Sequence, residues 1–115
     1  MSQLREFAQH KADFDKLNTR IVALSVDDVT HAHDTWDKAA NRQYPILSDP
    51  QANVIREFGL LHANGHDKQD IAIRTTIYID GSGIERFRRV STSAMDVPKV
   101  KEILGRIQTT QASTQ

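Results

Sequence analysis

The chain has 115 residues, of which fifteen are basic and fifteen acidic, so its net charge is zero. A protein without net charge has no overall electrostatic field of one sign that could attract nucleic acid or anionic lipid. It contains no cysteine, which excludes disulfide bonds, thiolate metal ligands and thiol catalysis by this sequence alone. The length suits one domain with a single modest core.

The first part of the chain has two helical patterns separated by an apolar run. Ser2 is a suitable N-cap for a helix that continues to about Leu17, and the apolar residues of this stretch fall on one face. Residues 20–27 contain several apolar side chains without clean alternation, which is typical of a strand covered on both faces. Thr30 is a suitable cap for the second helix, over residues 31–40.

The middle of the chain is marked by prolines and glycines. Residues 44–50 predict a short extended segment, because each of two prolines keeps its preceding residue out of the helical region. A short helix over residues 51–58 is expected to end at Gly59, since glycine suits the left-handed conformation that commonly follows a helix. Residues 60–70 are mostly polar, which predicts a loop.

The last part of the chain predicts a hairpin followed by a helix. Residues 75–80 are rich in β-forming side chains, and an Asp-Gly-Ser-Gly turn leads to a partner strand over residues 84–90. Asp96 is expected to cap the final helix, with Pro98 in its first turn. The buried stripe expected for this helix consists of Val97, Val100, Ile103, Leu104 and Ile107. Residues 109–115 are small and polar, which predicts a disordered tail.

This order of elements predicts an α/β domain over residues 1–108, in which helices pack on a mixed β-sheet. The domain opens with a helix, so no strand precedes that helix to complete a β-α-β crossover. The first 14 residues carry charges throughout, unlike a signal peptide, and no stretch approaches the roughly 20 apolar residues of a membrane span. We therefore expect a cytoplasmic protein.

Three segments of the sequence carry recognisable motifs. Residues 21–27 end in Ser-x-Asp, residues 44–50 read Tyr-Pro-Ile-Leu-Ser-Asp-Pro, and residues 74–80 read Arg-Thr-Thr-Ile-Tyr-Ile-Asp, with a glycine following. In this order and at this spacing, with residues 54–59 between them, they resemble the peroxiredoxin family, in particular its bacterioferritin-comigratory and alkyl hydroperoxide reductase branches. The resemblance spans about residues 4–104.

The resemblance implies a thioredoxin-like fold and antioxidant (redoxin) chemistry, in which the cysteine of a Pro-x-x-x-Thr/Ser-x-x-Cys loop reacts as a thiol peroxidase. Met1 falls just after the position where that loop would end, so the opening strands and the cysteine are absent together. Of the family's active site, the resemblance assigns only Arg74, which would contact the thiolate and the peroxide oxygen. A fixed guanidinium charge suits that role. We expect no catalytic residue, cofactor or metal in this chain.

The missing strand has a structural consequence. In the thioredoxin fold it lies between the strands that correspond to residues 21–27 and 75–80, and its loss leaves two apolar edges facing a gap of about 9–10 Å. Exposed strand edges favour association with further strands. We expect either direct pairing of the two strands or filling of the gap by a second copy or another chain, and hence a homo-oligomer or a complementing partner.

Two pairs of histidines could suggest a metal site. His31 and His33 lie about 200° apart on a helix, so they cannot hold one metal from one face, and a solvated helix start is favoured. His62 and His66 flank a glycine and could bind Zn²⁺ or Ni²⁺ weakly with a nearby aspartate. A polar loop is the favoured interpretation, because no third strong ligand stands at a diagnostic spacing.

Other polar groups have simple structural explanations. Ser25 and Ser48 stand near aspartates but not on a Gly-x-Ser-x-Gly elbow, so hydrogen bonds of caps and turns are favoured over hydrolysis. Residues 86–89 hold three arginines and one phenylalanine, and a solvated edge strand is favoured over an RNA or phosphopeptide surface. Trp36 falls on the apolar face of its helix and is predicted to lie in the core.

Two hypotheses on function remain open. The first is a peroxiredoxin-like domain that is not competent for thiol peroxidase chemistry alone. The second is a non-catalytic module that self-associates or binds a partner, including a version in which another chain supplies the missing strand and cysteine to a composite site with Arg74. Peroxide consumption by the isolated protein, and its dependence on Arg74 once a partner is added, would separate them.

Overall fold

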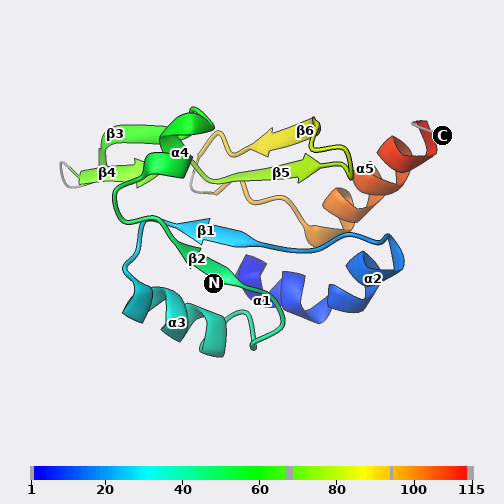
Figure 1. The fold of residues 1–115 in the computed structure, drawn as a ribbon, viewed down its shortest axis with the longest axis horizontal. Helices are drawn as coiled ribbons and strands as arrows, with labels where there is room; N and C mark the ends of the chain where they lie inside the picture. Colours follow the sequence, from blue (N-terminus) through cyan, green and yellow to red (C-terminus); the bar gives the residue numbers. More distant parts are fainter. Residues whose placement is uncertain (1, 67–68, 94, 114–115) are drawn as a thin grey trace. The chain divides into compact units, whose positions relative to one another are not determined.

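The computed structural model describes residues 2–66, 69–93 and 95–113 (Figure 1). Its contacts group into two compact units, Met1–Ile73 and Arg74–Gln115, where the sequence predicted one domain. Both units have the helices and strands of an α/β protein. Among the described residues, no helix is both long enough and apolar enough to cross a membrane.

The first unit contains a β-α-β motif that the sequence predicted in outline. β1 (Ala23–Ser25) and β2 (Ile46–Ser48) pair in parallel, with Leu24 opposite Leu47. α3 (Val29–Lys38) connects the two strands and lies against β2. β1 is shorter than the apolar run that predicted it, because only three of its residues find ladder partners on β2.

The cap of α3 differs from the predicted one. Asp28, rather than Thr30, precedes the helix in an extended conformation, with φ −69° and ψ 172°. Its Oδ1 accepts the backbone N–H of His31 at 2.8 Å. This carboxylate satisfies one of the free donors of the first turn, so the helix begins two residues earlier than the sequence predicted.

The predicted first helix is in fact two helices, α1 (Ser2–Gln9) and α2 (Lys11–Lys16). The break falls at His10, whose φ of −101° and ψ of 13° lie outside the helical region. The Nδ1 atom of His10 is hydrogen-bonded to a carboxylate oxygen of Asp13 at 2.9 Å. The amphipathic pattern continues across the break, so periodicity alone could not reveal it.

The stretch predicted to be a polar loop forms a hairpin instead. α4 (Asn53–Glu57) ends, as predicted, with Gly59 in the left-handed conformation at φ +74°. β3 (Leu61–His66) then pairs with β4 (Gln69–Ala72) in an antiparallel ladder. The ladder joins backbone groups of mostly polar residues, and such pairing leaves no hydrophobic alternation in the sequence.

The second unit opens with the hairpin that the sequence predicted. β5 (Thr75–Ile79) pairs in antiparallel fashion with β6 (Glu85–Val90). Tyr78 stands opposite Phe87, and their rings stack with centroids 5.5 Å apart. In the turn, Oδ1 of Asp80 accepts two backbone N–H groups, at 2.8 and 3.0 Å, which fixes the short connection.

The last helix, α5 (Val100–Ser113), contradicts two predictions. It continues through most of the segment expected to be a disordered tail, and the hydroxyl groups of Thr109 and Thr110 donate to carbonyls one turn earlier, at 3.0 and 2.8 Å. Asp96 does not cap it. The carboxylate of Asp96 is instead engaged by Arg89 of β6, a partner that sequence spacing does not indicate.

Asp96 anchors the segment before α5 to β6. Arg89 donates to its two carboxylate oxygens at 2.6 and 2.9 Å, and the backbone N–H of Thr92 donates at 2.8 Å. The hydrogen bonds from Arg89, followed by the one from Thr92, hold the pKa of Asp96 well below its ordinary value of 3.8. The charged form of Asp96 is therefore the one that the fold favours.

This lowered pKa predicts an acid-sensitive contribution to stability. A carboxyl group whose pKa is lower in the folded state stabilises the fold above its unfolded pKa, and the contribution is lost as the pH falls through the folded value. Between about pH 5 and about pH 2, urea unfolding should show a larger loss of stability for the wild-type chain than for Asp96→Asn. Asp27→Asn, a change at an exposed aspartate, is the control, and equal losses in wild type and Asp96→Asn would contradict the assignment.

Each described strand has a single ladder partner: β1 pairs with β2, β3 with β4, and β5 with β6. Direct pairing of residues 21–27 with residues 75–80, one of the two outcomes expected from the sequence, is not among these ladders. One edge of β1 and one edge of β5 therefore have no ladder partner in the described part of the chain. Val22, just before β1, is 57% exposed, and Ile79, at the end of β5, is 48% exposed.

The buried apolar residues are mostly small in the first unit and aliphatic in α5. Tyr44 is buried, and its hydroxyl donates to the backbone carbonyl of Leu4 at 2.8 Å. Trp36, predicted as core, is only half-buried, and the guanidinium of Arg42 lies over its ring at 4.9 Å from the centroid. The other buried apolar residues are Phe14, Ala32, Ala39, Ala40, Ala52 and Ile55 in the first unit, and Val100, Ile103 and Ile107 in the second.

Candidate functional site

Arg74, the residue that the family resemblance assigns to thiolate and peroxide, stands directly before β5. Its backbone carbonyl accepts the N–H of Ser91 at 2.9 Å, which extends the β5–β6 hairpin and fixes the backbone that carries the side chain. The side chain is exposed, and no carboxylate among the described residues forms an ion pair with it. An anion can therefore approach the guanidinium of Arg74 from solvent.

The arginines of residues 86–89 are in a different situation from Arg74, because a carboxylate already neutralises each of them. Such internal pairing leaves little free positive charge for RNA or a phosphopeptide, in agreement with the favoured interpretation of a solvated edge strand. The ion pairs are Arg86 with Asp80, Arg88 with Glu85, and Arg89 with Asp96, each at 2.6 Å.

The serines that end β1 and β2 make hydrogen bonds to the loop after β1. Oγ of Ser25 accepts the backbone N–H of Asp27 at 3.0 Å, and Oγ of Ser48 donates to the carbonyl of Asp27 at 2.6 Å. Among the described side chains, no histidine is hydrogen-bonded to either serine. The contact of Ser25 confirms the interpretation as a turn hydrogen bond, whereas that of Ser48 is a long-range bond between the ends of the two strands. Neither contact supports a hydrolytic triad.

The side chain of Asp49 caps the first turn of α4. Asp49 is 8% exposed, and its carboxylate accepts the backbone N–H groups of Asn53, Val54 and Ile55 at 3.0, 3.1 and 3.1 Å. These donors belong to the first turn of α4, where a helix has no partners of its own for them. Asp49 thereby holds α4 at the carboxyl end of β2, a role that the sequence indicated only as general capping.

The histidines take part in separate contacts. Nδ1 of His31 lies 2.8 Å from Oδ1 of Asp28, and this hydrogen bond raises the pKa of His31 above 6.5. The ring of His33 packs on Trp36 at a centroid distance of 5.3 Å. The side chains of His62 and His66 lie outside the described residues. Within the described part of the chain, no three potential metal ligands come together.

Comparison with known proteins identifies related sequences. The AhpC/TSA family model matches residues 1–87. The chain is 34% identical over 86 residues to a peroxiredoxin of Hyperthermus butylicus, a match that covers 70% of this chain and 35% of the relative. A peroxiredoxin of Aeropyrum pernix is also 34% identical over 86 residues, with 70% of this chain and 33% of the relative covered. The chain thus spans about a third of the length of these curated relatives.

Solved peroxiredoxin structures have the same fold. The reduced Prx3 of Vibrio vulnificus in complex with H2O2 matches with a TM-score of 0.81 at 16% identity, over 93% of this chain and 67% of that one. A mutant of the peroxiredoxin 6 of Arenicola marina matches with a TM-score of 0.86 at 19% identity, over 98% and 55% of the two chains. These identities show the fold alone, and they confirm the predicted thioredoxin-like α/β class. Because the family model covers most of the sequence, the chain belongs to the AhpC/TSA family of peroxiredoxins.

Proposed function

We propose that this chain is a peroxiredoxin-like domain of the antioxidant redoxin type that cannot carry out thiol peroxidase chemistry by itself. The observation that carries the proposal is the absence of any cysteine from a sequence that keeps Arg74, the residue that the family resemblance assigns to the thiolate and the peroxide. A thiol peroxidase needs a thiolate to attack the O–O bond of the peroxide and to take up one oxygen as a sulfenic acid. No other side chain of this chain supplies that nucleophile.

In this proposal Arg74 keeps its family role toward a thiolate that comes from outside the sequence. Its guanidinium is permanently charged, exposed and carried on a hairpin, and no described carboxylate neutralises it. A thiolate beside such a group would have a lowered pKa, and a peroxide oxygen could accept one of its hydrogen bonds. The isolated chain with dithiothreitol should therefore consume H2O2 no faster than the reductant alone, and thiol-dependent turnover by the chain would contradict the proposal.

The strand edges favour a second candidate function, that of a module which self-associates or binds a complementing chain. β1 and β5 each have one edge without a ladder partner in the described chain, and Val22 beside β1 exposes more than half of its surface. Unpaired edges with apolar neighbours favour strand addition, and a net charge of zero does not oppose it. For either candidate function, we propose the cytoplasmic location that the sequence analysis expected.

Self-association can be measured by light scattering over a range of micromolar concentrations. We expect the average mass to exceed that of a monomer as the concentration rises. Val22→Lys should reduce association, because a charge beside an edge strand disfavours edge-to-edge pairing. Val29→Lys is the matched control, since Val29 is 74% exposed at the start of α3. A monodisperse monomer at high micromolar concentration would contradict self-association.

A further inference from the structure

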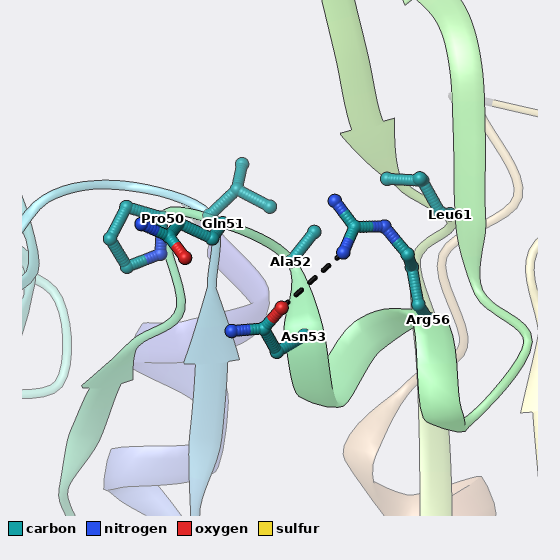
Figure 2. A pocket seen from close by; sticks show the side chains of 7 residues that line it. Pro50, Gln51, Ala52, Asn53, Arg56 and Leu61 are labelled. Atoms are coloured by element: carbon teal, nitrogen blue, oxygen red, sulfur yellow. Dashed lines mark hydrogen bonds between the residues drawn. The ribbon is translucent and has the colours of Figure 1, made fainter.

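A pocket of about 400 Å³ in the first unit has no role in the function proposed above. It is lined by Val26 after β1, by residues 50–53 after β2, by Arg56 of α4 and by Leu61 at the start of β3 (Figure 2). Ligands of open α/β sheets generally bind beyond the carboxyl ends of parallel strands, where this pocket lies. Its volume falls within the usual range for small-molecule sites.

Arg56 supplies the positive charge of the pocket. Figure 2 shows its guanidinium reaching from α4 toward Ala52 and Leu61. Its Nη1 atom donates to Oδ1 of Asn53 at 3.3 Å, a long hydrogen bond to a neutral group. No carboxylate among the described residues forms an ion pair with Arg56. With respect to the described residues, one of its five N–H donors is engaged, which leaves the others for a ligand.

The chain segment that follows β2 forms the opposite wall. Ala52 has a left-handed backbone, with φ 56° and ψ 30°, which is unusual for a residue other than glycine and is held by a hydrogen bond from its N–H to the carbonyl of Asp49 at 2.9 Å. Figure 2 shows Pro50 and Gln51 on one side of this turn and Asn53 on the Arg56 side. Of these side chains, the amide of Asn53 therefore stands near the guanidinium, with its oxygen toward Arg56.

We propose that this pocket binds a small organic carboxylate. The carboxylate would lie against the guanidinium of Arg56, because the two planar groups can form two parallel hydrogen bonds. A short apolar body would contact Val26, Pro50 and Leu61, which an inorganic oxyanion could not use. The proposal involves neither Arg74 nor any thiol, so it stands independently of the proposed function.

The sequence did not single out this site. Asn53 and Arg56 are three residues apart on one short helix, which places them on the same face, but such pairs are common on helices. Only the structure adds Val26 and Leu61, which come from other segments, and the left-handed turn at Ala52. The pocket therefore depends on tertiary structure.

Titration of the ¹⁵N-labelled full chain with benzoate, followed by NMR, tests this proposal. We expect saturable shifts of the backbone amides of Val26, Gln51, Ala52 and Asn53. Arg56→Gln should weaken binding about tenfold or more, since it removes the charge-assisted hydrogen bonds. Arg20→Gln, the same change at an exposed arginine outside the pocket, should keep the wild-type affinity.

Three results would overturn the proposal. The first is that benzoate causes no saturable shift at these amides. The second is that Arg56→Gln binds benzoate as tightly as the wild-type chain does. The third is that inorganic phosphate, titrated in parallel, binds more tightly than benzoate, because that would show a site for an oxyanion without an organic body.

Discussion

Replacement of Asp49 by alanine is expected to lower the free energy of unfolding by about 2–3 kcal/mol, one of the two largest effects we predict. Asp49 is 8% exposed, and its carboxylate accepts three backbone N–H groups at the start of α4. Alanine would remove the acceptor of all three donors, and the N–H of Ile55 is buried, so water cannot readily replace its partner. Urea unfolding followed by circular dichroism measures the difference.

Two further variants show whether the cap explains the effect. Asp49→Asn keeps one acceptor oxygen and should therefore lose less stability than Asp49→Ala. Asp28→Ala removes the cap of α3, which lies at an exposed position and bonds one backbone N–H, so its loss should also be smaller. A change of less than about 0.5 kcal/mol for Asp49→Ala would show that its hydrogen bonds contribute no more than an ordinary surface group.

Ile103→Ala should destabilise the protein by about 2–5 kcal/mol, the range for deletion of a buried aliphatic side chain that leaves a cavity. Ile103 is 2% exposed and lies on the buried face of α5 with Val100 and Ile107. Alanine has the higher helix propensity, so the loss must come from packing and not from the helix itself. Urea unfolding again provides the measurement.

Lys101→Ala is the matched control for Ile103→Ala, because Lys101 is exposed on the same helix. It should change the stability by no more than about 0.5 kcal/mol. If the two variants lost the same stability, α5 would not be packed through the face that carries Ile103. A loss confined to Ile103→Ala would support the buried stripe that the sequence predicted.

The sequence predicted those parts of the fold that have local signals. The β5–β6 hairpin follows from two β-forming runs around an Asp-Gly turn, and the end of α4 follows from Gly59. Three residues of the predicted stripe, Val100, Ile103 and Ile107, are buried as helical periodicity indicated, whereas Val97 precedes α5 and is 38% exposed. Each of these features is determined by residues close together in the chain.

The errors fall where the deciding contact is distant or involves only the backbone. The β3–β4 ladder joins polar segments through main-chain hydrogen bonds, which side-chain patterns do not show. Asp96 looked like a helix cap, and its engagement by Arg89 of β6 could be seen only in the structure. The same holds for the break at His10, since the apolar face continues through it.

The candidate site was predictable only in part. Arg74 came from the family resemblance, since an arginine before a β-strand has no chemical signal of its own. The structure adds that its side chain is exposed and has no described carboxylate partner. The pocket beside Arg56 was not predictable, because its walls come from three separate segments.

The most direct test of the central claim is a complementation assay with H2O2 and dithiothreitol. A synthetic peptide would carry a β-strand followed by Pro-x-x-x-Thr-x-x-Cys, the family motif that this sequence lacks. The chain alone should show no thiol-dependent turnover, and chain plus peptide should exceed the rate of the peptide alone. Arg74→Ala should abolish that gain, whereas Arg20→Ala, at another exposed arginine, should keep it. Turnover by the chain alone, no gain with the peptide, or an undiminished gain with Arg74→Ala would contradict a site completed from outside this chain.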